Sequence, residues 1–347
     1  MKYTNLGRSG LQVSRLCLGM MSYGASSWQP WVLPAQAGEH FVRRALDSGI
    51  NFFDTADFYS YGASEEILGK AIVEMTRRDQ VVLSTKAGLP MRTGANGGGL
   101  SRKHIRESLH ASLRRLRTDY VDVFLLHQPD PCTPLEETLD AVKDLVREGK
   151  ILYFGASNFP GWMLAKAAYT SRHSRELPVS VAQIQYNLCY REDERDVLPL
   201  SRDEGLGLMV YSPLARGWLA GNRAGAQQAQ SKNEAARAAT DAKAHSLYGS
   251  DGDRAVLARV MELAQRRDVP PARLAMSWIL SRPEVSSMLC GVLDDSHLDE
   301  ALLALDLELG PDDIAFLESA YQPQALKDTG LGAVLGSAAS PSRKQVP

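Results

Sequence analysis

Short apolar runs alternate along this chain with longer amphipathic stretches. The apolar runs are rich in β-branched and aromatic residues and end in Gly, Asn, Asp or Pro turns, which is typical of buried β-strands. Several amphipathic stretches begin at residues that favour helix N-caps, such as Ser64 and Ser101. The predicted strands cover residues 14–19, 51–55, 81–86, 121–127, 152–157, 181–187, 207–212 and 286–292. The predicted helices cover residues 38–48, 64–78, 101–117, 135–149, 160–175, 191–204 and 252–281.

This alternation of strands and helices predicts an α/β fold. Continuously apolar strands suit a parallel sheet that is buried on both faces. Eight strand-then-helix units over about 290 residues favour a closed (β/α)8 barrel of the TIM type, although an open Rossmann sheet has the same periodicity. We expect residues 1–322 to form one such barrel.

Three segments lie outside this alternation. Residues 1–13 predict a β-hairpin that turns around Gly7–Gly10 and plugs one end of the barrel. Residues 222–251 are rich in Ala, Gln and Lys, and they fit either a mobile loop over a ligand or a solvated linker. Residues 323–347 have the composition of a disordered tail, with a partial lid as the alternative.

The composition limits the classes of partner. The 347 residues are 44% hydrophobic and 23% charged with a net charge of -2, which implies no general attraction to nucleic acid or anionic lipid. Four widely spaced cysteines fit reduced thiols, and no apolar run approaches the ~18 residues of a membrane span. No Cys/His cluster indicates a metal site. We therefore expect a cytoplasmic protein without membrane, nucleic-acid or metal partners, and the oligomeric state stays open.

Polar side chains close three successive predicted strands. Asp54, Lys86 and His127 end these strands, and Tyr59 follows Asp54 by five residues. Each residue alone has an ordinary structural explanation, such as a capping Asp or a core His. The carboxyl ends of barrel strands surround the active site, however, so the four side chains together form a candidate catalytic group.

The chemistry of this group fits carbonyl reduction. Tyrosine has a pKa of about 10, and a nearby ammonium lowers that pKa while a carboxylate fixes the lysine. Tyr59 could then act as the general acid, and a neutral His127 could hydrogen-bond the substrate carbonyl oxygen. None of these side chains can deliver a hydride, so the hypothesis requires a nicotinamide cofactor.

Several motifs appear in one order along the chain. They are GINFFDTADFYSYGASEEILGKAI at 49–72, STK at 84–86, LLHQPDP at 125–131, GASN at 155–158, QIQYN at 183–187 and YSPLARG at 211–217. From residue 3 to about 322 the sequence resembles the aldo-keto reductase family, and most of all its bacterial and potassium-channel β-subunit-like branch. The resemblance implies a barrel, a catalytic tetrad of Asp54, Tyr59, Lys86 and His127, and NADPH lying across the carboxyl-terminal mouth.

The resemblance also implies which residues contact the cofactor. Amide and hydroxyl side chains would hold the nicotinamide carboxamide, an aromatic ring would stack on the nicotinamide, and the segment after strand seven would bind the pyrophosphate. The first group is Ser157, Asn158 and Gln183, the ring is Tyr211, and the segment supplies Ser212, Leu214, Arg216 and Gly217. The other expected contacts are Gly19, Met20, Met21, Asp54, Gly291, Leu293 and His297, of which the methionines could equally be core residues.

The sequence departs from the family after strand eight. A basic residue, a Gln or Arg, and an Asn usually grip the adenosine 2′-phosphate there, whereas this chain has Asp294, His297 and Ala301. A carboxylate disfavours a phosphate but hydrogen-bonds a free 2′-hydroxyl. We therefore expect NADPH with weakened discrimination against NADH. The missing charge could still come from His297 or from lysines and arginines of residues 222–254, such as Arg223, Lys232 and Arg254.

Two other functions fit parts of the pattern. A Schiff-base lyase of the aldolase kind would use Lys86 as its nucleophile, although Asp54 would hold that lysine protonated. A nucleotide-sensing regulatory subunit would share the same motifs. For the reductase, the expected partner is a small aldehyde, ketone or sugar-like carbonyl, bound by an aromatic rim drawn from Tyr23, Trp28, Trp31, Phe58, Tyr61 and Trp218.

Overall fold

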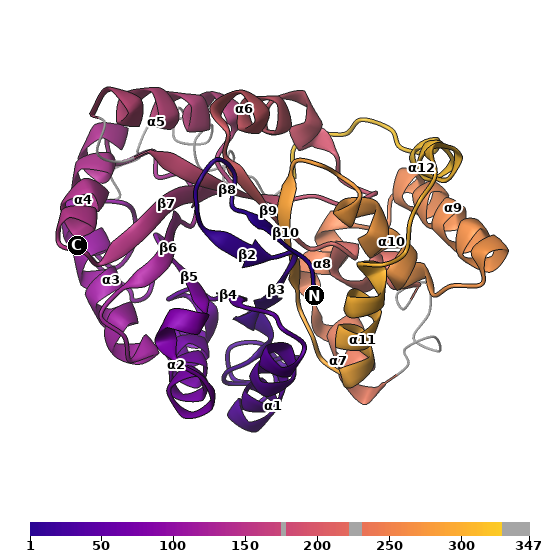
Figure 1. Cartoon of the computed structure of the whole chain (residues 1–347), viewed down its shortest axis with the longest axis horizontal. Coiled ribbons are helices and arrows are strands. Elements are labelled where there is room, and N and C mark those ends of the chain that lie inside the picture. Colours follow the sequence, from indigo (N-terminus) through magenta and orange to yellow (C-terminus); the bar gives the residue numbers. More distant parts are fainter. Residues whose placement is uncertain (175–177, 222–230, 328–347) are drawn as a thin grey trace, which may run out of the picture.

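Eight parallel strands close into a barrel in which each strand pairs with its successor and the last pairs with the first. The computed structural model describes residues 1–174, 178–221 and 231–327. Figure 1 shows the barrel with its ring of helices, which confirms the predicted (β/α)8 fold. The barrel strands are β3 (Leu16–Gly19), β4 (Phe52–Asp54), β5 (Val82–Ala87), β6 (Val121–Leu126), β7 (Ile151–Ser157), β8 (Val179–Gln185), β9 (Gly207–Tyr211) and β10 (Val285–Cys290).

The helices follow the predicted order with one clear error. The helix predicted over 252–281 is two helices, because Pro270 and Pro271 cannot continue the first one and Pro271 instead begins the second. The α-helices are α1 (Ala35–Asp47), α2 (Ala63–Met75), α3 (Arg102–Leu116), α4 (Leu135–Arg147), α5 (Gly161–Ser174), α6 (Val197–Glu204), α7 (Lys232–Thr240), α8 (Ala242–Leu247), α9 (Asp251–Arg267), α10 (Pro271–Leu280), α11 (Asp295–Ala304) and α12 (Pro311–Glu318). Short 3₁₀ turns are η1 (Met20–Ser22), η2 (Tyr59–Gly62), η3 (Arg78–Gln80), η4 (Glu192–Arg195) and η5 (Ala215–Ala220).

The two-residue period of the strands separates an inner core from an outer core. Phe52 and Val82 belong to the cluster inside the barrel, whereas Phe53 and Leu83 belong to the cluster between strands and helices. Asp54 and Lys86 have the same parity as Phe52 and Val82 and lie nearer the carboxyl ends of their strands. Strand pleating therefore turns both charged side chains into the barrel at its carboxyl-terminal mouth.

An N-terminal hairpin closes the opposite end of the barrel, as predicted. Its strands are β1 (Tyr3–Asn5) and β2 (Gln12–Ser14), and Leu6 is fully buried in the inner core. Gly7 has a φ of +60°, and a Cβ there would lie 2.3 Å from the backbone nitrogen of Gly207, so the hairpin fits tightly against the start of β9. Ser14 belongs to this hairpin, and the first barrel strand begins only at Leu16.

The segment after η5 is helical where the structure describes it. Ser231 caps α7 and Asp241 caps α8 through their side chains. For residues 231–247 the prediction of a mobile loop or linker was therefore wrong, because two good N-caps and a run of alanines favour helix there. Residues 222–230, including Arg223, lie outside the described residues. We refer to α7 and α8 together as the roof.

The predicted C-terminal tail is described only as far as Lys327. Gln324 donates a backbone hydrogen bond to Glu192 at 2.8 Å, and the backbone N–H of Lys327 donates to the Tyr190 hydroxyl at 3.3 Å. These contacts attach residues 324–327 to the segment around η4. The rest of the predicted tail, residues 328–347, lies outside the described residues.

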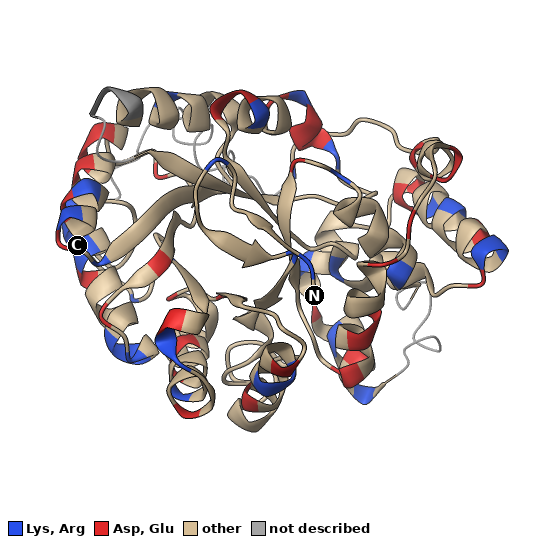
Figure 2. Ribbon diagram, in the orientation of Figure 1, with Lys and Arg blue, Asp and Glu red and all other residues tan. Residues whose placement is uncertain are grey.

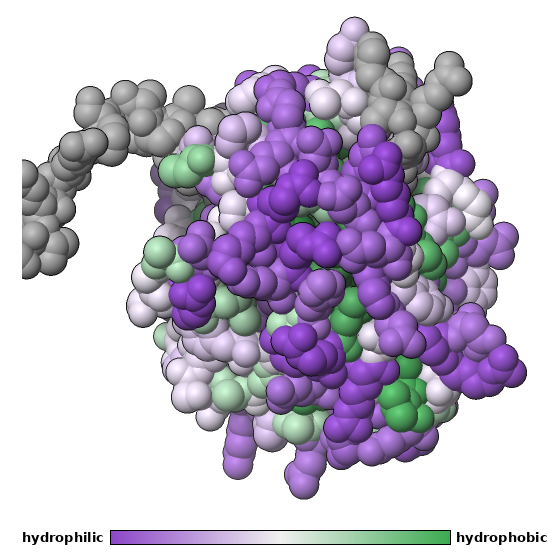
Figure 3. All heavy atoms as spheres, turned by 90° about the vertical axis from the view of Figure 1, so that its left-hand side faces the viewer, coloured by the Kyte–Doolittle hydropathy of each residue, from purple (hydrophilic) through white to green (hydrophobic). Residues whose placement is uncertain are grey.

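Charged residues of both signs are mixed around the outer ring of helices (Figure 2). The face over α3 and α4 is mainly hydrophilic, with small separate apolar areas (Figure 3). Within the described ranges, no helix is both long and apolar enough to cross a membrane. Unlike the charged residues on the helices, the Asp54–Lys86 pair is buried inside the barrel.

Candidate active site

The four candidate catalytic side chains meet at the mouth of the barrel. Asp54 ends β4, Lys86 lies near the end of β5, His127 directly follows β6, and Tyr59 begins the short turn η2. Lys86 is fully buried, and Asp54 is 1% exposed. The structure therefore brings the four side chains together, as the sequence predicts.

Lys86 is the centre of the group. Its Nζ donates to Asp54 Oδ2 at 2.5 Å, to the Thr55 carbonyl at 2.8 Å and to the Tyr59 hydroxyl at 3.3 Å. Burial by itself lowers the pKa of Lys86, but the Asp54 carboxylate and the Tyr59 hydroxyl outweigh it and leave that pKa above its ordinary value. Lys86 is therefore an ammonium that is held against the tyrosine hydroxyl.

Tyr59 is a protonated phenol in this arrangement. Burial raises its pKa above the ordinary value, and the opposing effect of the Lys86 ammonium is smaller. Lys86 lowers the pKa of Tyr59, as expected, but burial disfavours the phenolate more than one cation favours it. A phenol that keeps its proton until charge develops beside it suits a proton donor.

His127 is a neutral imidazole beside Tyr59. Their ring centroids are 5.8 Å apart in an edge-to-face arrangement. Burial first, and then the positive charges of Lys86 and Lys243, hold the pKa of His127 well below its ordinary value. The Nδ1 atom is buried and has no hydrogen-bond partner among the described residues. A neutral ring agrees with the role predicted from the sequence.

A cavity of about 770 Å³ opens from this group toward α10 and α11. Its volume lies within the range of small-molecule and cofactor sites. Met20 is the only predicted cofactor contact that does not line it, and Met20 is instead a core residue beneath the mouth. The contacts that line it are Gly19, Met21, Asp54, Ser157, Asn158, Gln183, Tyr211, Ser212, Leu214, Arg216, Gly217, Gly291, Leu293 and His297.

The residues expected at the nicotinamide are joined to the tetrad by hydrogen bonds. Gln183 donates to Asp54 Oδ1 at 3.0 Å. The Asn158 amide donates to the Ser157 hydroxyl at 3.1 Å and accepts from the Tyr211 hydroxyl at 2.7 Å. Amide, hydroxyl and aromatic groups thus line the cavity beside the buried charge pair, and this donor set matches a carboxamide on a flat ring.

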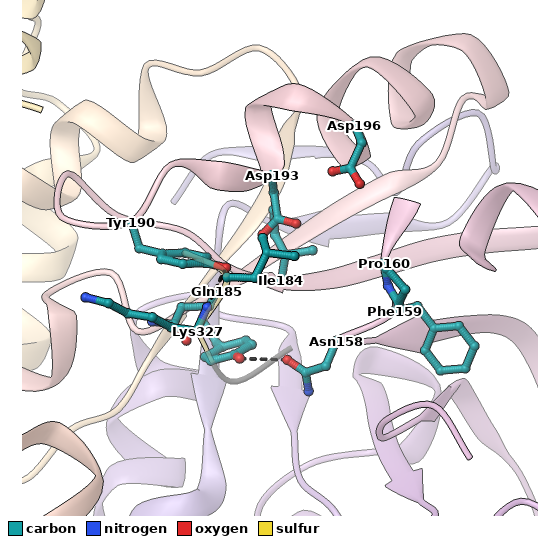
Figure 4. Close-up of a pocket in the computed structure, with 11 residues that line it drawn as sticks. Asn158, Phe159, Pro160, Ile184, Gln185, Tyr190, Asp193, Asp196 and Lys327 are labelled. Carbon is teal, nitrogen blue, oxygen red and sulfur yellow. Dashed lines mark hydrogen bonds between the residues drawn. The ribbon is translucent and has the colours of Figure 1, made fainter. Parts of the chain in front are cut away.

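A smaller pocket of about 30 Å³ lies next to Asn158 and Tyr211 (Figure 4). Asp193 lines it, and burial together with the nearby Asp196 and Glu192 carboxylates raises the pKa of Asp193 to about 7. Its volume suits a water molecule or two rather than a substrate.

The segment expected at the pyrophosphate is unusually turned. Ser212, Ala215 and Arg216 all have φ values between +49° and +57°, and Gly217 has a φ of +98°. Left-handed residues outside glycine are uncommon and cluster at ligand sites. Such a turn can direct successive backbone N–H groups toward an anion.

Arg216 has a partner that the sequence did not indicate. Its Nε and Nη2 atoms each lie 2.9 Å from Asp241 Oδ2, and Asp241 also accepts from Arg237. The Arg237 guanidinium lies 4.4 Å from the centroid of the Trp31 ring, on the α1 side of the cavity. The roof therefore contacts Arg216 of η5 on one side of the cavity and Trp31, just before α1, on the other.

The far end of the cavity is acidic. His297 Nε2 lies 2.5 Å from Glu234 Oε1, and the backbone N–H of Leu293 donates to His297 Nδ1 at 3.3 Å. Asp294 accepts hydrogen bonds from Ser231 and Asn233 of the roof. Glu234 was missed from the sequence because its segment was interpreted as a loop or linker.

Of the cations suggested for this end, His297 lines the cavity and is paired with Glu234, and Arg237 of the 222–254 segment also lines it. The other two described candidates do not reach it. Arg254 bonds to Asp251 and to the Gly249 carbonyl, away from the cavity, and Lys232 does not line it.

The aromatic rim is smaller than predicted. Trp28, Trp31 and Phe58 line the cavity, and the Trp28 ring lies tilted at 46° to the Tyr59 ring, with the centroids 6.3 Å apart. Tyr23 is buried in the core, Tyr61 is 58% exposed, and Trp218 donates to the Asp253 carbonyl. These three residues are therefore not part of the rim, because the sequence alone does not show which way a loop side chain points.

Sequence comparisons agree with the fold. A model of the aldo/keto reductase family matches residues 15–322. The chain is 36% identical to a versiconal hemiacetal acetate reductase of Aspergillus parasiticus, over 94% of this chain and 98% of the relative. It is 34% identical to an aldo-keto reductase of Fusarium vanettenii, over 94% and 92% of the two chains. It is 38% identical to a "Probable voltage-gated potassium channel subunit beta" of Oryza sativa, over 88% and 92%.

Matches of this length cover both the barrel strands and the loops that carry the site. Among the described residues, no group of three or more His, Cys, Asp or Glu side chains could hold a metal ion. With its closed barrel, its buried Asp54–Lys86 pair and these relatives, the chain belongs to the aldo/keto reductase family.

Proposed function

We propose that the protein is an NAD(P)H-dependent carbonyl reductase that converts aldehydes or ketones, sugar-like ones included, to alcohols. One observation carries the proposal, namely the buried Lys86 ammonium bonded to both Asp54 and the Tyr59 hydroxyl at the floor of a large cavity. Tyr59 lines the cavity, where a substrate oxygen could reach its hydroxyl, and the Lys86 ammonium is buried directly behind that hydroxyl.

Each residue has one role in the proposed reaction. The hydride that reduces the carbonyl carbon comes from a bound nicotinamide, because no side chain here can supply it. Tyr59 donates its proton to the carbonyl oxygen, and Lys86 stabilises the phenolate that is left. Asp54 keeps Lys86 charged and in place. Neutral His127 orients the carbonyl oxygen and stabilises its developing charge.

The donor set supports a nicotinamide dinucleotide as the cofactor. Ser157, Asn158 and Gln183 suit the carboxamide, Tyr211 suits the ring, and the left-handed turn from Ser212 to Gly217 suits the pyrophosphate. The residues of α11 that line the other end of the cavity, such as His297 and Ala301, would then hold the adenosine end. We propose NADPH as the cofactor, with NADH as the alternative.

The acidic far end is expected to weaken the preference for NADPH. Glu234, paired with His297, lines the end of the cavity at α11, and a carboxylate there would disfavour a 2′-phosphate. In Glu234→Gln, the affinity for NADPH relative to NADH should rise by about tenfold, because about 1.4 kcal/mol of charge repulsion is removed. Titration of intrinsic tryptophan fluorescence with each nucleotide measures this ratio.

The matched control for this charge is Asp251→Asn, on the exposed start of α9 outside the cavity. It should leave the ratio unchanged. A thousandfold preference for NADPH in the wild type would contradict the weakened discrimination, and an unchanged ratio in Glu234→Gln would exclude Glu234 as its cause.

The two alternative functions have less support. A Schiff-base lyase needs a lysine with a depressed pKa, whereas the pKa of Lys86 is raised. Borohydride trapping of a substrate adduct on Lys86 would favour the lyase. A nucleotide-sensing subunit would bind the same cofactor, so turnover separates it from an enzyme.

A carbonyl panel tests the proposed reaction. Trp28, Trp31 and Phe58 form an apolar wall beside Tyr59, so we expect aromatic aldehydes and ketones to be reduced with lower KM than small sugars. Consumption of NADPH and of NADH is followed with each compound, and the alcohol product is identified. Binding of nucleotide without turnover of any carbonyl would contradict the reductase and favour the sensing subunit.

A further inference from the structure

A buried cluster with two carboxyl groups, Asp57 and Glu65, lies on the outer side of β5, behind the loop that carries Tyr59. Glu65 of α2 is fully buried; its Oε1 accepts from the Thr85 hydroxyl at 2.5 Å and its Oε2 from Arg115 Nε at 2.6 Å. Thr85 immediately precedes Lys86 and points to the opposite side of the strand. This cluster therefore touches the same strand as the tetrad without entering the cavity.

Asp57 is the unusual member of this cluster. It is fully buried, and its backbone N–H donates to the Lys86 carbonyl at 3.1 Å. Neither of its carboxyl oxygens has a well-formed hydrogen bond or ion pair among the described residues. The cation that acts on Asp57 is Arg115, which is bound by Glu65. A buried carboxylate without a counterion is strongly disfavoured, so Asp57 is a candidate neutral acid.

The pKa of Asp57 agrees with that geometry. Burial first, and then the Glu65 carboxylate, raise the pKa of Asp57 to about 8, and the effects of Arg115, the Phe58 N–H and the Ser108 hydroxyl oppose this only in part. Asp57 therefore carries a proton at neutral pH and can donate one hydrogen bond.

The hydrogen bonds of α3 provide an acceptor for that proton. His104 Nδ1 lies 3.2 Å from the Asn96 carbonyl, which can only accept, so Nδ1 carries the hydrogen. Burial lowers the pKa of His104, so the ring is neutral and its Nε2 must accept from the Ser108 hydroxyl at 3.2 Å. The Ser108 oxygen is then left to accept a hydrogen bond from protonated Asp57.

We propose that Asp57 is a positioning residue for the carbonyl reduction, a neutral acid that donates to Ser108 and so fixes the loop that presents Tyr59. The inference rests on the proposed function. Asp57 precedes Tyr59 by two residues. The two residues that follow Tyr59, Ser60 and Tyr61, have left-handed backbone with φ values of 49° and 50°. Such a backbone persists only when its surroundings fix it, and Asp57 is part of those surroundings.

Ionisation of Asp57 breaks this arrangement. The charges that act on it are Glu65 from α2 and Arg115 from α3, and the titratable His104 of α3 is bonded to Ser108. Lys86 of β5 meets Asp57 only through its backbone carbonyl. A new negative charge next to Glu65 repels it and removes the donor to Ser108. We therefore expect the kcat for reduction to fall by up to tenfold per pH unit above pH 8, before Tyr59 itself titrates.

The test compares pH profiles of kcat and KM for the wild type, Asp57→Asn and Asp57→Ala. Asparagine keeps a donor to Ser108 without a titrating group, so Asp57→Asn should retain kcat near pH 7 within about threefold and lose the decline near pH 8. Asp57→Ala should lower kcat at pH 7 by at least about tenfold with little change in the KM for cofactor. Asp122→Asn is the control, a buried carboxyl with a raised pKa that binds Arg78, and it should keep the wild-type profile shape.

Two outcomes overturn the proposal. One is an unchanged decline near pH 8 in Asp57→Asn, and the other is loss of neutral-pH activity in a folded Asp57→Asn protein, which would mean that the carboxylate is the required form.

A readout without turnover keeps the inference separate from the proposed function. In ¹³C NMR, the ring resonance of Tyr59 in the wild type should shift with an apparent pKa near 8, and this shift should be absent in Asp57→Asn. If the wild type reduces no carbonyl, the reductase proposal fails while this coupling still decides the role of Asp57.

Folding stability gives a second check. Because the folded-state pKa of Asp57 is raised, stability is lost as pH rises from about 4 to about 8, and Asp57→Asn should flatten that loss.

Discussion

Replacing Tyr59 by phenylalanine is expected to lower kcat for carbonyl reduction by about 10²–10⁴-fold, the usual contribution of a general acid. The hydroxyl lies 3.3 Å from Lys86 Nζ, and its pKa is raised, so it holds the transferable proton. The ring and its tilted contact with Trp28 are retained in the variant, and nucleotide affinity should therefore stay within about threefold. Steady-state kinetics with the best substrate of the panel, together with fluorescence titration of the cofactor, measure both quantities.

Tyr61 supplies the matched control. It lies on the same turn, is 58% exposed and does not line the cavity, so Tyr61→Phe should keep wild-type kcat. Full activity in Tyr59→Phe would remove the proposed role of the phenol, whatever the control shows.

Replacing Lys86 by methionine is expected to reduce both stability and activity. Asp54 would remain 1% exposed with Gln183 as its donor but without a cation, and removal of one partner from a buried ion pair costs about 3–5 kcal/mol. The kcat should fall with it, because nothing then stabilises the phenolate of Tyr59. Urea unfolding and kinetics of the folded fraction are the measurements.

A double variant separates the two effects of Lys86. Lys86→Met with Asp54→Asn removes the stranded charge, so it should recover most of the lost stability while kcat stays low. Lys70→Met, which breaks an exposed pair with Glu39, should change stability by less than about 1 kcal/mol. If Lys86→Met unfolds at the same urea concentration as Lys70→Met, the pair does not have the stabilising role inferred here.

The sequence predicted best those features that local patterns determine. Strand order and the barrel followed from the alternation of apolar runs with amphipathic helices. The grouping of Asp54, Lys86 and His127 at one end of the barrel followed from the rule that strand ends surround the mouth. The N-caps Ser231 and Asp241 also signalled two helices, but the alanine-rich composition around them was interpreted as a loop. The two capping residues are thus a local signal for helix in this segment.

Other features depend on contacts between distant segments. Arg216 meets Asp241, and His297 meets Glu234, only because the roof folds back over the mouth. The raised pKa of Tyr59 depends on how deeply its loop is buried, and burial of a loop cannot be predicted from the local sequence pattern. The exclusion of Tyr23, Tyr61 and Trp218 from the rim has the same origin.

The N-terminal hairpin has a practical consequence for handling the protein. Leu6 and the tight contact of Gly7 with Gly207 close the amino-terminal end of the barrel, and Tyr3 donates to the Gly49 carbonyl at that same end. The first residue thus lies on the pole opposite Tyr59. A fusion partner or an immobilising tether attached through Met1 should leave the catalytic mouth facing the solution.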